Sequence, residues 1–68
     1  MNEEALNLSI RKFLKQFGVG SQREIELAVQ KALQSGKLRG TETIPARATL
    51  RIDPLGLEFT TESDITLA

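Results

Sequence analysis

The chain has 68 residues, of which 40% are hydrophobic and 26% charged, with three Phe as its only aromatic residues and neither Cys nor His. This length and composition predict a single globular domain, 1–68, with a small core. Without Cys and His, the sequence excludes disulfides and thiolate metal sites and lacks the commonest general base. We therefore expect no metal, no cofactor and no enzymatic activity.

Formal charge is balanced overall but divided along the chain. Residues 1–40 hold seven Lys and Arg against four acidic residues, a net +3, whereas residues 41–68 hold two against five, a net −3. The two halves can attract each other within a chain or between chains, but neither is basic enough for a nucleic-acid arm. No apolar run is long enough for a signal peptide or a membrane span, so we expect a cytoplasmic protein.

The first expected helix covers about residues 3–17. Its apolar residues are spaced three or four apart and share one stripe of the helix: Leu6, Ile10, Phe13, Leu14 and Phe17. Glu3 and Glu4 suit the first turn, and Gly18 suits the position just past the end, where positive φ stops a helix.

A second helix is expected at about 21–35. "SQRE" is typical of a capping box, in which Ser21 and Glu24 each bond the other's backbone N–H. Gly36 is expected just past its end. Its inner stripe consists of Ile25, Ala28, Val29, Ala32 and Leu33.

After a connector, the apolar period changes from 3.6 to 2. The alternation of apolar and polar residues over 44–53 predicts a strand, and the same alternation over 57–61 predicts a second one. Between them, "DPLG" predicts a turn with Pro54 near φ −65°. "ESD" suggests another turn, which leaves a short third strand at 64–67 open. The expected fold class is α+β, with a two-helix hairpin packed on a small antiparallel sheet in the order helix, helix, strand, strand.

No motif predicts a catalytic residue. The four serines lack a His partner, the acidic residues are scattered, and "GVGS" follows a helix rather than the buried strand that precedes a phosphate-binding loop. These residues are better explained as caps, turns and solvated surface.

A weak nucleic-acid binder of helix-turn-helix type is the alternative function. Two helices joined by a short Gly-containing turn, with a strand pair after them, are consistent with that class. Glu24 and Glu26 oppose it, since they would face phosphates. The candidate contacts are Arg11, Lys12, Lys15, Arg23 and Lys31.

The leading hypothesis is a non-enzymatic, self-associating interaction module. Leu8 and Leu27 lie opposite the apolar stripes of their helices and are the candidate interface residues. We expect a homodimer whose strand region crosses or extends between subunits, and the connector 35–46 would permit exchange of the hairpin. Another protein partner is not identifiable, and nucleic acid is the less favoured ligand.

Four segments together resemble a family of short proteobacterial proteins of unknown function: "MNEEALNLSIRKFLKQFGV", "SQREIELAV", "SGKL" and "PARATLRID". The similarity covers nearly the whole chain, and the run from "SIRKFLKQFGV" to "SQREIE" is its specific part. The resemblance implies a compact cytoplasmic bacterial α+β protein and offers no catalytic or binding residues.

Overall fold

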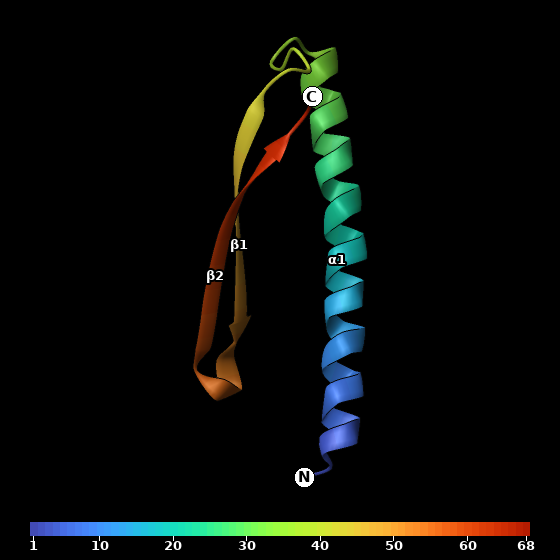
Figure 1. The fold of residues 1–68 in the computed structure, drawn as a ribbon, viewed down its shortest axis with the longest axis vertical. Helices are drawn as coiled ribbons and strands as arrows, with labels where there is room; N and C mark the ends of the chain where they lie inside the picture. The colour runs from blue at the N-terminus through green and yellow to red at the C-terminus, as the bar shows by residue number, and fades with distance from the viewer. The chain divides into compact units, whose positions relative to one another are not determined.

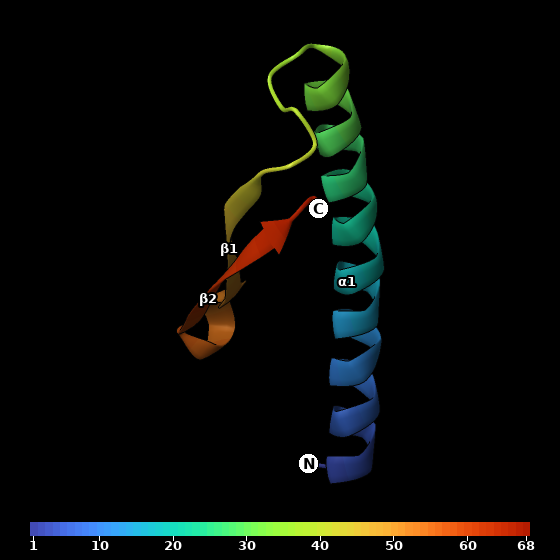
Figure 2. The ribbon, with the colours of Figure 1, turned by 45° about the horizontal axis from the view of Figure 1, so that its top comes forward.

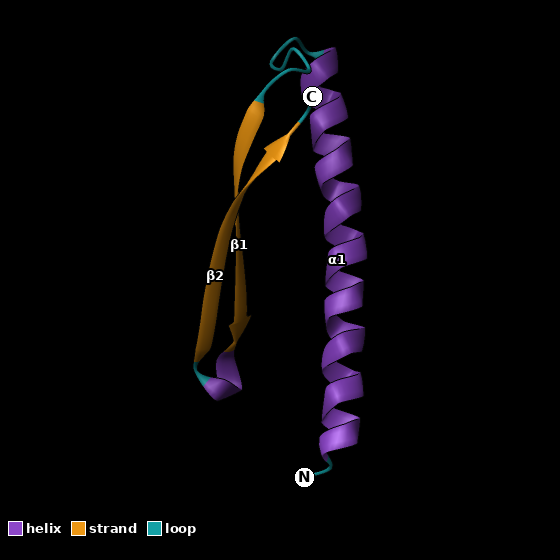
Figure 3. Ribbon diagram, viewed as in Figure 1, coloured by secondary structure: helices purple, strands orange, loops and turns teal.

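One uninterrupted helix occupies the first half of the chain. The computed structural model describes all 68 residues, and α1 extends over Glu3–Gln34 (Figure 1). It is followed by β1, Thr43–Ile52, the 3-10 turn η1, Asp53–Leu55, and β2, Leu57–Thr66 (Figure 3). The α+β class is confirmed, whereas the predicted pair of helices at 3–17 and 21–35 is wrong.

The chain stays helical through Gly18 and Gly20, and Figure 2 shows the helix unbroken from a second direction. Two glycines inside a helix cost about 1 kcal/mol each relative to alanine. A break would instead leave up to four carbonyls and four N–H groups without helical partners. Continuation satisfies all of these groups, so Ser21 is an interior residue and the predicted capping box at Ser21 is wrong.

The ends of α1 have local causes. The Asn2 side chain accepts a hydrogen bond from the Ala5 N–H over 3.0 Å, which makes Asn2 the N-cap. At the other end, Gly36 adopts φ +80° and its N–H donates to the Leu33 carbonyl over 3.2 Å. Termination at Gly36 is therefore confirmed.

The strands form a two-stranded antiparallel sheet in a continuous register of ten pairs, from Thr43 opposite Thr66 to Ile52 opposite Leu57. The turn between them is confirmed: Pro54 lies in η1, Gly56 adopts φ +62°, and the Gly56 N–H donates to the Asp53 carbonyl over 3.0 Å. This left-handed conformation is one that glycine adopts without steric cost.

The first strand is confirmed to within one residue at each end, but the second is longer than predicted. β2 continues through "ESD" to Thr66, because β1 provides a pairing partner for every residue up to Thr43. The third strand that was left open at 64–67 is largely the end of β2, so the sheet has two strands.

The structure divides into two compact units, Met1–Lys37 and Leu38–Ala68. The first is the helix with its ends, and the second is the hairpin with the segment that leads into it. No residue in the chain is buried, so neither unit contains a core of its own.

Candidate association surface

An apolar stripe runs along α1. In its N-terminal half the side chains are large, and each is between 46% and 50% exposed: Leu6, Ile10, Phe13, Leu14 and Phe17. The stripe continues after Ser21 with Ile25, Ala28, Val29 and Ala32, of which Val29 and Ala32 are half-buried. From Leu6 to Ala32 it extends about 39 Å at a rise of 1.5 Å per residue.

The two halves of the stripe are offset around the helix. The apolar spacing of Ile10, Phe13, Leu14 and Phe17 repeats fifteen residues later at Ile25, Ala28, Val29 and Ala32. At about 100° per residue, fifteen residues make four turns and about 60° more. A repeat longer than 3.6 residues per turn makes the stripe wind around α1 in the right-handed sense.

One face of the hairpin carries polar pairs that join the strands. Arg47 Nε donates to Glu62 Oε1 over 2.9 Å, and Arg51 donates through a terminal nitrogen to Glu58 Oε1 over 2.8 Å. Between them the Thr49 and Thr60 hydroxyls are 3.0 Å apart. Both ion pairs are more than half exposed, so each contributes at most about 1 kcal/mol.

The opposite face of the hairpin is apolar at its ends and small in its middle. Residues directly opposite each other in the register share a face. Ile44 and Ile65 form one end, the side chains of Ala46, Ala48, Thr61 and Ser63 form the middle, and the turn end consists of Leu50, Ile52, Leu57 and Phe59. Phe59 is 58% exposed on this face, whereas Ile44, Leu50 and Ile65 are half-buried.

The two outer edges of the hairpin differ. The Leu67 N–H donates to the Glu42 carbonyl over 2.9 Å, and hydrogen-bonded pairs alternate with non-hydrogen-bonded pairs along an antiparallel ladder. Pro45, opposite Asp64, therefore turns its backbone nitrogen outward, where β1 lacks one donor. On β2 the outward-facing residues include Glu58 and Glu62, which pair with Arg51 and Arg47, and Asp64, which has no ion-pair partner.

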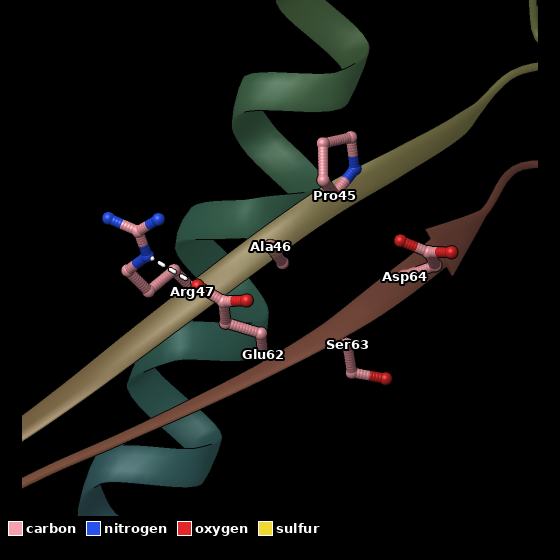
Figure 4. Close-up of a pocket in the computed structure, with 6 residues that line it drawn as sticks. All are labelled: Pro45, Ala46, Arg47, Glu62, Ser63 and Asp64. Carbon is pink, nitrogen blue, oxygen red and sulfur yellow. Dashed lines mark hydrogen bonds and ion pairs between the residues drawn. The ribbon is translucent and has the colours of Figure 1, made fainter.

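A shallow hollow lies beside the Arg47–Glu62 ion pair (Figure 4). Its lining comes from adjacent positions of both strands, and successive positions of a strand point to opposite faces. The hollow therefore straddles the edge of a two-stranded ribbon and is open to solvent. Its lining residues are Pro45, Ala46, Arg47, Glu62, Ser63 and Asp64.

A carboxylate that the sequence analysis missed organises the segment before β1. Glu42 accepts hydrogen bonds from the N–H groups of Arg39 at 2.8 Å, Gly40 at 2.9 Å and Thr41 at 3.2 Å. The Arg39 N–H, followed by those of its neighbours, lowers the pKa of the Glu42 carboxyl below its usual value. Gly40, at φ +101°, was the available signal for this turn.

The structure does not bring the two predicted interface leucines together. Leu8 and Leu27 are exposed, at 60% and 53%, but they lie on one helix. Nineteen residues separate them by about 28 Å along the axis and about 100° around it. They are therefore two separate apolar positions rather than one surface.

The five predicted nucleic-acid contacts also lie on α1. Arg11, Lys12, Lys15, Arg23 and Lys31 cover about 200° of its circumference at 100° per residue, so they do not form one positive face. No turn separates two helices, so the helix-turn-helix geometry is absent. Binding of nucleic acid by these residues through a geometry other than a helix-turn-helix stays a prediction.

No three Asp and Glu residues of the chain gather where they could hold a metal ion. No helix combines the length and apolar character that crossing a membrane requires.

One long helix followed by a two-stranded antiparallel hairpin defines a small α+β protein. The chain belongs to DUF6494, a family of unknown function, whose model matches residues 1–68. The resemblance to an uncharacterised family is thus confirmed. No curated protein and no solved structure matches the chain.

Proposed function

We propose that this chain is a non-enzymatic module that self-associates as a homodimer through the apolar stripe of α1. One observation carries the proposal: no residue is buried, although the stripe contains large hydrophobic side chains. Those with exposures of 40% or more are Leu6, Ile10, Phe13, Leu14, Phe17, Ile25 and Leu33.

Neither unit is expected to be stable by itself. Most helical stability in proteins comes from packing of an amphipathic face rather than from propensity. An isolated two-stranded hairpin is marginal in water at best. Both elements therefore need a cover, and the sequence offers no disulfide or thiolate metal site in its place.

A second copy of the chain is a partner that the net charge permits. The chain has nine Lys and Arg against nine Asp and Glu, so two copies do not repel each other through net charge. Exchange of the hairpin through the connector stays a prediction, as does the cytoplasmic location.

The non-enzymatic part of the proposal rests on the chemistry that the chain lacks. There is no His or Cys in the chain, and the hollow that contains Ser63 is open to solvent. An enzyme normally places its reacting groups in a concave site.

The test is the mass of the protein in solution, measured by light scattering after gel filtration at tens of micromolar. We expect a mass twice the 7.5 kDa of one chain. Phe17→Glu places a charge in the middle of the stripe and should weaken association at least tenfold. Leu8→Glu and Leu27→Glu introduce the same charge outside the stripe and should leave the mass unchanged.

Each other outcome has a defined meaning. A single-chain mass that does not change with concentration would overturn the dimer. Dissociation by Leu8→Glu or Leu27→Glu, with Phe17→Glu without effect, would overturn the stripe as its surface. A gel shift with DNA that weakens steeply as salt rises would favour the nucleic-acid alternative.

A further inference from the structure

The apolar stripe of α1 changes in side-chain size along its length. Its central positions in the first half are Leu6, Ile10, Phe13 and Phe17, all of them large. The corresponding positions in the second half are smaller on average, with Ile25 the only large one: Ser21, Ile25, Ala28 and Ala32. The gradient runs along a single helix because α1 is continuous from Glu3 to Gln34.

We propose that two copies of α1 pair antiparallel, with the two-fold axis near Val19. This inference rests on the proposed self-association and specifies its geometry. The stripe of each copy is covered by α1 of the other copy, so the contact is between two helices.

Side-chain size supports the antiparallel direction. With the axis at Val19, Phe17 faces Ser21 of the second copy, and Ile10 faces Ala28. Leu6 faces Ala32 in the same way, whereas Phe13 faces Ile25, so three of the four large central side chains of the first half meet a small one. A parallel pair would set Phe against Phe at one end and Ala against Ala at the other, which leaves gaps that a close-packed interface does not tolerate.

The charges at the two ends of the helix support the same direction. The first turn carries Glu3 and Glu4, and the last turn carries Lys31. An antiparallel pair brings the acidic turn of each helix next to the basic turn of the other and opposes the helix dipoles. A parallel pair would set the four carboxylates of the two first turns side by side.

The hairpin edges are poor alternatives for self-pairing. The β1 edge lacks a donor at Pro45, and on β2 the Asp64 carboxylate has no ion-pair partner, whereas Glu58 and Glu62 pair with Arg51 and Arg47. The helix is therefore the element of this chain that is most complementary to itself.

Distances between spin labels test the direction of pairing. The chain has no Cys, so each introduced cysteine is the only labelling site. Ala5→Cys, Gln16→Cys and Gln30→Cys lie outside the stripe at increasing distance from Val19 in the order Gln16, Gln30, Ala5. An antiparallel pair separates equivalent labels along the axis by about 9, 33 and 42 Å in that order.

Each pattern of distances has one interpretation. A shortest distance at Gln16 and much longer ones at Gln30 and Ala5 would support the proposal, with Gln16→Cys as the internal control for pairing. Three similar distances in a protein of double mass would overturn the antiparallel geometry and leave the dimer intact. Double mass with distances that follow no order from residue 19 would place the contact on the hairpins. Absence of a dipolar signal with a single-chain mass would overturn the dimer itself.

Discussion

Glu42 shows how one side chain shapes the segment between helix and sheet. Its carboxylate accepts hydrogen bonds from three backbone N–H groups, at distances from 2.8 to 3.2 Å. Without it, these N–H groups would have to donate to water. The turn at Gly40 brings these donors to one point. A carboxylate held by several N–H groups favours its charged form, so the conformation of this turn is coupled to pH.

We expect this turn to lose its hydrogen bonds in acid. The folded pKa of Glu42 lies below its usual value of 4.5, so the stabilisation is complete above pH 4.5 and disappears as the pH falls through the folded pKa. The amide shifts of Arg39, Gly40 and Thr41, followed by NMR, should titrate together at a pH below 4.5. In Glu42→Gln those amides should no longer respond to acid. A shared midpoint above 4.5 would contradict the assignment.

Single residues with a fixed conformational role were the most predictable part of the sequence. Gly36 ends the helix, and Pro54 lies in the turn that joins the strands, as expected from their backbone preferences. Glu42 was missed because a Glu that bonds the N–H groups of residues just before it has no characteristic spacing. Gly18 and Ser21 are residue types that are common at helix ends, but both lie inside α1.

Glycines inside and past the end of α1 should respond in opposite directions to alanine. A Cβ at Gly20 would meet no atom within 4 Å, so Gly20→Ala should stabilise the helix by about 1 kcal/mol. Gly36 has φ +80°, so Gly36→Ala should destabilise it by about 1–2 kcal/mol. Urea unfolding followed by circular dichroism measures both. Loss of stability in Gly20→Ala would indicate a turn at that point.

The elements show why local signals gave only part of the fold. Alternation of apolar and polar residues predicted β1 to within a residue, because a strand with one apolar face imposes its period directly. The extent of β2 depended on pairing with β1, which is not local to "ESD". α1 is continuous because a break would leave backbone N–H and carbonyl groups without hydrogen-bond partners. Gly18, read as a helix end, and Ser21, read as a helix start, do not reveal that cost.

Self-association stays a prediction, and only the residues proposed to carry it change with the structure. In the sequence, Leu8 and Leu27 are the predicted interface because each lies opposite the apolar stripe of its own expected helix. Once the helix is continuous, those leucines diverge and the stripes merge into one surface. The geometry of that surface followed only from the backbone.

At the scale of the whole molecule, folding and association should be coupled. A protein that is stable only as a dimer has a melting temperature that rises with concentration. Between about 2 and 200 μM we expect an increase on the order of 10 °C, measured by circular dichroism. Phe17→Glu should melt at a lower temperature in the same concentration series. A melting temperature independent of concentration would show that each chain folds alone.

Pro45 and the carboxylates of β2 have a consequence for the chain during and after its synthesis. A hairpin with one apolar face and open edges is the kind of segment from which fibrils grow, because each added strand offers a new edge to the next. Here Pro45 removes one donor from the edge of β1, and Asp64 places a carboxylate at the edge of β2. We therefore expect both edges to disfavour the addition of a further strand and the growth of a fibril from this hairpin.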